Sequence, residues 1–402
     1  MTRYLRKTWE RIIEAMLFLS GTITSITVVL IIFFLFKEGL GLFNKRPVED
    51  STVIASHISN PIKKLSPNQI RDIFNQKVVN WKEVGGKDEP IIRFTVNDIA
   101  NFYTEEQIGE NFEHLSEKID EHITKTPGII AVFSNAYQAK PFHGHIFEIS
   151  TVKIRDFIGG QDWFPTSTPA AELGVLPLIL GTLWVSLGAI LLALPLGLAT
   201  AIYLAEIADP RLRSFLKPLI ELLASIPSVV YGFFGLVVIV PLIKDLFRLD
   251  VGETALAGSF ILAIMALPTI ITISEDAIRN TPKVMKEASL ALGATQWQTI
   301  VRVIIPYSIS GITAGAILGM GRAIGETMAV LMVTGNAAVM PHSFLQPVRT
   351  IPATIAAELG ESTYGGLHFR ALFALGCILF LITFGMNIFV ELIASKRKYN
   401  KI

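Results

Sequence analysis

The sequence predicts an all-α polytopic membrane protein with six transmembrane helices and an α/β extracytoplasmic insert between the first two. Hydrophobic residue types make up 51% of the 402 residues and charged types only 17%, whereas ordinary soluble domains are nearer a quarter charged. Residues 44–165 hold 14 Lys and Arg and 17 Asp and Glu, which is 31 of the chain's 69 charged residues. A polar block of ordinary charge density is therefore embedded in a chain that is too apolar for water.

Six apolar runs are long enough to cross a bilayer, which takes about 20 residues of helix. The first run is interpreted as an uncleaved span rather than a signal peptide, because Lys37 and Glu38 follow it where small cleavage-site residues would stand. The fifth run is interrupted by two charged residues, Arg322 and Glu326. The six runs are 15–36, 173–205, 222–243, 254–274, 303–340 and 371–390.

Lys and Arg near the span ends indicate the orientation, because loops on the cytoplasmic side are enriched in them. They gather before the first span and after the second, fourth and sixth, whereas the other short loops are poorer. Both termini are therefore expected in the cytoplasm and the insert outside. The expected division is 1–43 for the N-terminus and first helix, 44–165 for the insert, 173–395 for the membrane domain and 396–402 for a basic cytoplasmic tail.

Local patterns in the insert are typical of a soluble α/β unit. Residues 66–69, Ser-Pro-Asn-Gln, form a capping-box start with proline at the first helical position. Ile70, Ile73 and Phe74 then supply an apolar face at helical spacing. The other expected elements are strands at 91–96 and 129–133, turns at 85–86 and 127–128, and a polar helix that ends near residue 126.

Three stretches of the insert, 65–74, 79–86 and 126–130, resemble parts of periplasmic phosphate-binding proteins. That family holds phosphate on a Ser-Gly-Thr type turn that opens a helix, where backbone N–H groups meet the anion. This sequence has Asn-Asp-Ile-Ala at 97–100 instead, directly after an expected strand. The resemblance therefore implies a lobe without its phosphate-binding turn, with a docking, gating or structural role. Retained ligand binding is the alternative.

Cysteine and histidine usage limits the metal and redox chemistry. The single cysteine, Cys377, excludes a disulfide within the chain and a cysteine-built zinc site. His143 and His145 flank one glycine in the insert and suggest a metal site, but no third ligand stands at a diagnostic spacing. A histidine on the outer surface is usually just solvated, so no metal and no cofactor are expected.

The most specific motif lies between the fourth and fifth runs. Glu287-Ala288-Ser289 is followed by Gly293, and nine further residues separate Gly293 from Val-Ile-Ile-Pro at 303–306. This spacing resembles the signature of the membrane subunits of ATP-binding-cassette (ABC) importers, from which Ser289, Val303 and Ile305 are conservative departures.

The physical properties of this loop suit a docking helix. Residues 282–292 are expected to form a short helix that begins with proline and ends just before Gly293. Leu290, Ala291 and Leu292 offer an apolar patch to a partner's groove, and Pro306 begins the return into the membrane. The alternative is an ordinary amphipathic loop.

The sequence contains no Gly-x4-Gly-Lys-Ser/Thr phosphate loop. The chain is therefore expected to be a transport subunit and not an enzyme. The resemblance to ABC importers implies that ATP hydrolysis belongs to a partner subunit.

A charged pair interrupts the fifth span. Arg322 and Glu326 are four residues apart, so a continuous helix would place them on one face. Ionisable residues at membrane depth are costly and usually face a cavity or the bundle interior. Arginine also presents a planar fork of donors that suits phosphate oxygens. A role in translocation is expected, and a structural ion pair is the alternative.

Residues 321–330, Gly-Arg-Ala-Ile-Gly-Glu-Thr-Met-Ala-Val, with Thr-Gly-Asn at 334–336 and Pro-Ser-Val-Val-Tyr-Gly at 227–232, closely resemble the permease subunits of phosphate-specific importers. The resemblance covers roughly 173–395 and implies the type I importer membrane fold. It implies a substrate path along Arg322, Glu326, Thr327, Ser228 and Tyr231, although apolar packing is an equal alternative for the last two. It implies ATPase coupling through Glu287, Ala288, Ser289, Gly293 and Pro306.

The same resemblance implies the function and the partners. The chain would be the permease subunit of an ATP-driven phosphate importer in the bacterial plasma membrane. It would work with a second, PstA-like permease, an ABC ATPase dimer and an extracytoplasmic phosphate-binding protein. One alternative is a permease for sulfate or molybdate. A membrane-bound phosphate sensor is the other, but the expected cytoplasmic ends are too short for an output domain.

Overall fold

The computed structural model describes residues 2–49, 51–109 and 111–399. Within them, six helical segments are long and apolar enough to cross a membrane, which confirms the predicted fold class. Of the expected basic tail, residues 400–402 lie outside the described part. The six segments are Arg11–Asn44, Leu176–Ile207, Ser228–Phe247, Ala255–Arg279, Gln296–Gly325 and Leu367–Leu392.

The chain separates into two units, which are described in turn. The membrane unit comprises the described residues up to Phe36, Val175–Ser362 and those from Leu372 onward. The insert unit comprises Lys37–Gly174 together with Thr363–Ala371.

Three long helices form the centre of the membrane unit. Helix α10 (Ala255–Arg279) packs against both α6 (Leu176–Ile202) and α13 (Ile305–Gly325). Small residues allow this close approach. At Gly319 of α13, for example, an added Cβ would lie 2.7 Å from Cγ1 of Ile270 on α10.

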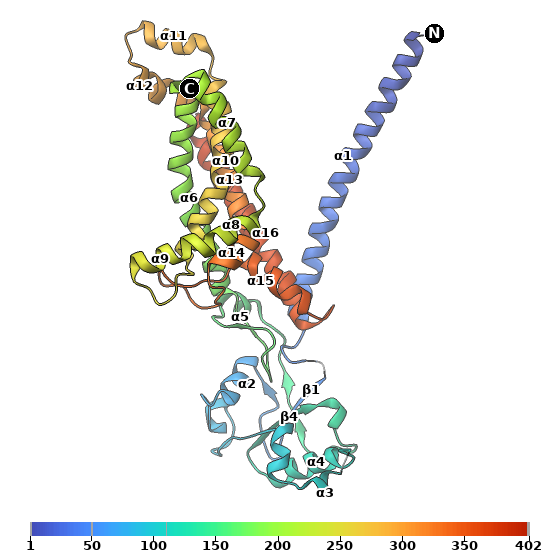
Figure 1. The fold of residues 1–402 in the computed structure, drawn as a ribbon. Helices are drawn as coiled ribbons and strands as arrows, with labels where there is room; N and C mark the ends of the chain where they lie inside the picture. The colour runs from blue at the N-terminus through green and yellow to red at the C-terminus, as the bar shows by residue number, and fades with distance from the viewer. Residues whose placement is uncertain (1, 50, 110, 400–402) are drawn as a thin grey trace. The chain divides into compact units, whose positions relative to one another are not determined.

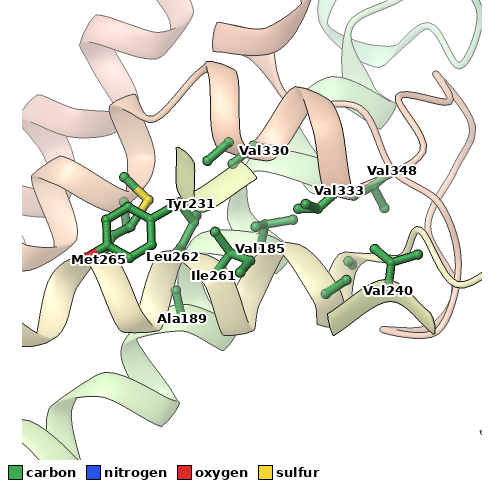
Figure 2. Packing of buried hydrophobic residues seen from close by; sticks show 14 of the residues in the cluster. Val185, Ala189, Tyr231, Val240, Ile261, Leu262, Met265, Val330, Val333 and Val348 are labelled. Atoms are coloured by element: carbon green, nitrogen blue, oxygen red, sulfur yellow. The ribbon is translucent and has the colours of Figure 1, made fainter. Parts of the chain in front are cut away.

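A buried apolar cluster joins these helices to the shorter ones (Figure 2). Its members come from α6, α10, α8 (Ser228–Phe234) and α14 (Met328–Val333), so the short helices are held by burial as well as by chain connection. The residues shown include Val185, Ala189, Tyr231, Ile261, Leu262, Met265, Val330 and Val333.

The predicted third span is not one helix. Helix α7 (Pro210–Ser225) ends before Ile226, which is extended with ψ 129°, and α8 begins after Pro227. A residue that precedes proline is disfavoured in the helical region, so the break at Ile226 follows from the sequence Ile-Pro. The run 222–243 therefore crosses a kink, and the helix continues through a π-turn (Gly235–Ile239) to α9 (Val240–Phe247).

The predicted fifth span is also shorter than expected. Helix α13 ends at Gly325, Glu326 is extended with ψ 134°, and the short α14 follows. Residues 334–350 then form a loop that leads to α15 (Ile351–Glu358). The run 303–340 is apolar on both sides of Arg322 and Glu326, and apolar content alone could not show where its helix stops.

The first and last helices pack on each other within the membrane unit. Phe34 of α1 (Thr2–Leu40) meets Phe373 of α16 (Leu367–Tyr399) edge to face, with ring centroids 5.5 Å apart. The Cys377 thiol donates to the Leu35 carbonyl oxygen, at 3.4 Å. The sole cysteine is thus buried in a helix contact.

The insert unit is built on a four-stranded sheet in the order β3-β4-β1-β5. Strand β4 pairs in parallel with β3 and antiparallel with β1, and β1 pairs antiparallel with β5. The expected strands at 91–96 and 129–133 correspond to β3 and β4. The four strands are β1 (Thr52–Ser56), β3 (Ile92–Thr95), β4 (Ile129–Ser134) and β5 (His145–Ile146).

Alternate residues of β4 bury opposite faces of the sheet, as strand geometry requires. Ile129 and Ala131 pack with α4 (Leu115–Lys125), whereas Ile130 packs with α2 (Pro67–Phe74) and the following turn. The expected capping box is present on α2, where Ser66 and Gln69 exchange side-chain to backbone hydrogen bonds.

The remaining elements of the two units are short. In the insert unit they are β2 (Lys64–Leu65), β6 (Glu148–Ile149), β7 (Trp163–Phe164), β8 (Glu172–Leu173), α3 (Glu105–Ile108) and α5 (Ile154–Gly159). In the membrane unit they are α11 (Lys283–Ala291) and α12 (Gln296–Thr299).

Candidate functional site

Helix α11 carries the loop motif and has a well-defined end. The Gly293 N–H donates to the Leu290 carbonyl and the Ala294 N–H to the Ser289 carbonyl, at 2.9 and 3.2 Å. This pair of bonds is a Schellman motif, which requires a left-handed residue after the helix. Gly293 supplies it with φ +84°. The helix occupies 283–291, close to the predicted 282–292.

The loop presents apolar side chains to its surroundings. Val284 is 74% exposed, Leu292 89% and Trp297 62%. Large exposed apolar groups gathered on one short loop are typical of a docking surface. Figure 1 shows α11 and α12 together at the end of the membrane unit where α7 begins. Glu287 and Ala288 are exposed on the same helix.

Hydroxyl pairs fasten this loop to the helices beside it. Ser289 of the motif bonds to Thr299, with 2.9 Å between the two oxygens. Thr281 bonds to Ser308 at 3.1 Å, and both of these side chains are buried. Pro306 lies inside a continuous helical segment rather than at its start, directly after a π-turn (Ile300–Ile304). Such a turn tolerates a proline that would break a regular helix.

The structure separates Arg322 from Glu326. Arg322 lies in the last turn of α13, but Glu326 is beyond the helix, and its carboxylate accepts from the Ala329 N–H at 3.4 Å. The Thr327 hydroxyl donates to the Gly325 carbonyl at 3.3 Å. In the described part of the chain, no hydrogen bond or ion pair joins Arg322 to Glu326. The predicted one-face pair is therefore wrong, because the helix ends between its two members.

Ser228 and Tyr231 lie at the kink after α7. Ser228 begins α8 and is half-buried. The Tyr231 side chain is 6% exposed, and its hydroxyl donates to the Leu223 carbonyl at 2.7 Å. Leu223 is one of the last residues of α7, so this bond crosses the kink. Tyr231 fixes the angle between the two helices.

Ion pairs around two carboxylates of the membrane unit, Glu358 and Glu275, were not anticipated. Arg349 contacts the Glu358 carboxylate at 2.8 Å and also donates to the Asn336 side chain at 2.9 Å. Glu275 is 1% exposed and pairs with Arg213 and with Lys217. Arg213 and Glu275 are 62 residues apart. Arg349 and Glu358 are closer in the chain but do not have the i,i+3 or i,i+4 spacing that would indicate a pair from the sequence.

The turn after β3 of the insert is closed by the chain's own acid. The Asp98 carboxylate accepts from the Thr95 N–H at 2.7 Å and from the Thr95 hydroxyl at 2.8 Å. Thr95 and Asp98 thus form a capping box at the start of a short 3-10 helix (Val96–Asn101). The lobe without a phosphate-binding turn stays a prediction.

The insert histidines make local contacts. His143 bonds through Nδ1 to the Asp120 carboxylate at 2.6 Å. His122 is packed against Phe94 and Phe102, and burial lowers its pKa. Among the described residues, no group of three or more His, Cys, Asp and Glu side chains could hold a metal ion.

A cavity of about 640 Å³ in the insert unit has a mixed charge. Arg71 lies at its wall, with Glu172 at 3.7 Å and Asp162 at 3.9 Å. Burial raises the pKa of the Glu172 carboxyl, an effect that Arg71 opposes. Acids and bases alternate along the wall, so the cavity has no single preference of sign. The other charged lining residues are Lys77, Lys153, Arg155 and Asp156.

Two family models match the chain. Residues 193–399 match the model of the binding-protein-dependent transport system inner membrane component. Residues 35–184 match the model of a PBP superfamily domain. The first match includes the loop motif and Arg322, and the second includes the whole sheet of the insert.

Curated relatives and a solved structure resemble the same regions. A probable ABC transporter permease protein YqgH of Bacillus subtilis is 40% identical over 63% of this chain and 81% of its own length. A phosphate transport system permease protein PstC of Mesorhizobium japonicum is 38% identical over 63% of this chain and 80% of its own length. The methionine ABC transporter MetNI in an inward-facing form is 18% identical, with a TM-score of 0.42, over 56% of this chain and 94% of that chain.

Proposed function

Because this chain belongs to the family of binding-protein-dependent transport system inner membrane components, we propose that it is the permease subunit of an ATP-driven importer of inorganic phosphate. The name of the Mesorhizobium japonicum relative, a phosphate transport system permease, supports the substrate. The chain is a multi-pass membrane protein, with six helices able to span. It would form half of the translocation path.

The observation that carries the substrate class is the position of Arg322. Its side chain is half-buried at the end of an apolar helix, and the nearest carboxylate in sequence, Glu326, caps the next helix instead. A guanidinium left without a carboxylate partner at membrane depth is costly unless an anion can approach it. Its planar donors match the oxygens of phosphate in pairs.

The proposed path continues from Arg322 to the residues around the helix break. Glu326 and Thr327 form the link between α13 and α14, and Ser228 opens α8. Hydroxyls and a carboxylate at helix ends can exchange hydrogen bonds with a partly dehydrated anion. Tyr231 would act on this path by holding the kink rather than by touching the anion, since its hydroxyl already bonds to Leu223.

The energy for transport would enter through α11. Glu287, Ala288 and Ser289 lie on this helix, Gly293 ends it and Pro306 follows in the returning helix. The exposed apolar groups of the loop would seat in an ABC ATPase dimer. ATP-driven closure of that dimer would move α11 and rock the spans between outward and inward access. No covalent chemistry is assigned to this chain.

The remaining partners follow from the family. A second, PstA-like permease would complete the path, and an extracytoplasmic phosphate-binding protein would deliver the anion. Both termini would lie in the cytoplasm of a bacterial cell, with the chain in the plasma membrane and residues 44–165 outside. The insert would dock or gate, since Asp98 occupies the donors of its β3 turn.

Reconstitution tests this function directly. The chain, a second permease and the ATPase are placed in proteoliposomes with the binding protein, and uptake of labelled phosphate is measured with and without ATP. ATP-dependent phosphate uptake that excess unlabelled sulfate and molybdate do not reduce is the expected result. Competition by sulfate or molybdate would show another oxyanion permease. Uptake of no oxyanion by an intact complex would overturn the proposal.

A further inference from the structure

Residues 280–299, called the coupling loop below, carry α11 and α12. Side chains from both of these short helices contact Glu206. Lys286 of α11 forms an ion pair with the Glu206 carboxylate, and Gln296 of α12 donates to the Glu206 backbone carbonyl at 3.1 Å. Glu206 is 80 positions before Lys286 and 90 before Gln296. One residue therefore holds both short helices of the loop.

Glu206 stands where α6 passes into a π-turn (Tyr203–Ile207). Just before it, Ala201 and Ile202 are buried with Ile278 and Ile300, which lie on either side of the coupling loop. The base of the loop is thus a small apolar cluster, and Glu206 is its polar edge. A π-turn is rare inside helices and often occurs at functional positions.

Apolar packing does not hold α11 in place. None of the side chains of α11 is buried, although its neighbour Thr281 and the base of the loop are. The Lys286 and Glu206 side chains are only 21% and 12% exposed. A pair shielded to this degree is screened less by salt than a surface pair. The orientation of α11 therefore depends on polar contacts, and the contact to Glu206 links α11 to the π-turn that continues α6.

We propose that Glu206 is a positioning residue that transmits movement of α11 to α6, so that the ATPase drives the spans through this contact. The inference rests on the proposed importer function. Without the contact, α11 could still bind the ATPase, but its displacement would be taken up by the loop. Transport would fall while ATP hydrolysis continued.

A reciprocal charge exchange tests the contact. Glu206→Lys and Lys286→Glu each place like charges together, and the double variant restores an opposite pair in reverse. In proteoliposomes, phosphate uptake per ATP hydrolysed should fall about five- to tenfold in each single variant, which corresponds to coupling energies typical of residues in contact. The double variant should recover most of that loss.

The matched control is Asp209→Lys. Asp209 is exposed, lies three residues after Glu206 and has no side-chain cap bond, so its reversal adds the same charge on the same connection. It should keep the ratio of uptake to hydrolysis within about twofold, the scale of surface changes.

A second measurement does not depend on the substrate. A spin label at position 283, introduced with Lys283→Cys in a Cys377→Ala background, reports the motion of the start of α11, away from the apolar docking residues. The single reversals should make this label more mobile in the assembled complex, and the double variant should restore the wild-type spectrum. If the wild-type complex imports no phosphate but the label responds in this way, the proposed function is wrong and the positioning role of Glu206 is supported.

Three outcomes would overturn the proposed positioning role of Glu206. One is an unchanged ratio of uptake to hydrolysis in both single variants. Another is a double variant no better than the singles. The third is equal loss of uptake and hydrolysis with unchanged label mobility, which would indicate a general defect in assembly.

Discussion

Glu326 follows Arg322 by four residues, yet it has left the helix that carries Arg322 and caps the next one, with its carboxylate 3.4 Å from the Ala329 nitrogen. A shared helix face would have made the two charges neutralise each other. The helix break keeps them apart. Under the proposed function, Arg322 would attract the anion, whereas the Glu326 carboxylate accepts from the Ala329 N–H at the start of α14.

Arg322→Gln is expected to abolish phosphate uptake while the complex still assembles, because it removes the charge with little change of volume. Glu326→Gln should be milder, since an amide oxygen can still accept from the Ala329 N–H. Labelled phosphate uptake and co-purification with the partner subunits measure the two effects. Lys244→Gln, at an exposed position of α9, removes one positive charge as a control and should transport normally.

The outcome that contradicts this assignment is specific. One such outcome is transport by Arg322→Gln at the wild-type rate, and another is loss of the protein from the membrane as its only defect. Either result would make Arg322 structural, and the anion path would lie elsewhere.

The sequence predicted those helix ends that are set by a capping residue close to the helix. Gly293 and the Ser66 capping box were found because a cap is encoded within about four residues. The six spans were also predictable, since length and apolar content suffice. The break at Glu326 was not, because a carboxylate can either pair along a helix or cap the next one, and both fit the same spacing.

Contacts between residues far apart in the chain could not be predicted from the sequence. Lys286 and Glu206, or Arg213 and Glu275, lie in different helices, and one chain contains no sign that they meet. The contact of Tyr231 with Leu223 could not be predicted either, although these two residues are only eight apart. The place of Tyr231 beside Arg322 in the expected path gave no hint that its hydroxyl would bond back to Leu223 across the kink.

Gly293→Val is expected to uncouple transport, whereas Gly293→Asn should largely preserve it. An added Cβ at Gly293 meets nothing within 4 Å, so size alone does not matter there. The backbone φ of +84° is what restricts the residue at this position, because a β-branched side chain is strained at positive φ whereas asparagine tolerates it. Uptake and ATP hydrolysis are measured together. The valine variant should lose uptake by a factor of about ten, which corresponds to a strain of about 1.4 kcal/mol, while hydrolysis persists. Equal behaviour of the two variants would contradict the role of the turn.

Acidification should loosen the insert through His122. Burial holds the pKa of His122 below its ordinary 6.5 in the folded state, so the neutral ring favours folding. This contribution is complete above about pH 6.5 and is lost as the pH falls toward the folded-state pKa. Protection of α4 amides from hydrogen exchange, corrected for the intrinsic rate, should decrease between pH 7 and pH 5.

Two comparisons isolate His122 from other titrating groups. Hydrogen bonds from Lys118 and Lys125 lower the pKa of Glu121 to about 2, so this carboxylate titrates in a more acidic range. His122→Phe should flatten the pH dependence, whereas the exposed His114→Gln should leave it as in wild type. A slope that survives His122→Phe would assign the effect to another group.

The buried carboxylate of Glu275 gives a sharper test of stability, because its neighbour in sequence is its natural control. Glu275 is 1% exposed beside Arg213 and Lys217, whereas the Asp276 side chain is 57% exposed and contacts Lys217 at 3.2 Å. Glu275→Gln removes the buried carboxylate that Arg213, Lys217 and Arg279 all contact, and only Lys217 keeps a contact with Asp276. The variant should lower the free energy of unfolding by roughly 3 kcal/mol. Asp276→Asn should lower it by less than about 1 kcal/mol, because water screens an exposed pair. Unfolding in mixed micelles, followed by circular dichroism, measures both.

In the double variant Glu275→Gln/Arg213→Gln the loss should be smaller than the sum of the single losses, since one unpaired cation is removed with its partner. Additive losses would mean that the two side chains do not interact in the membrane.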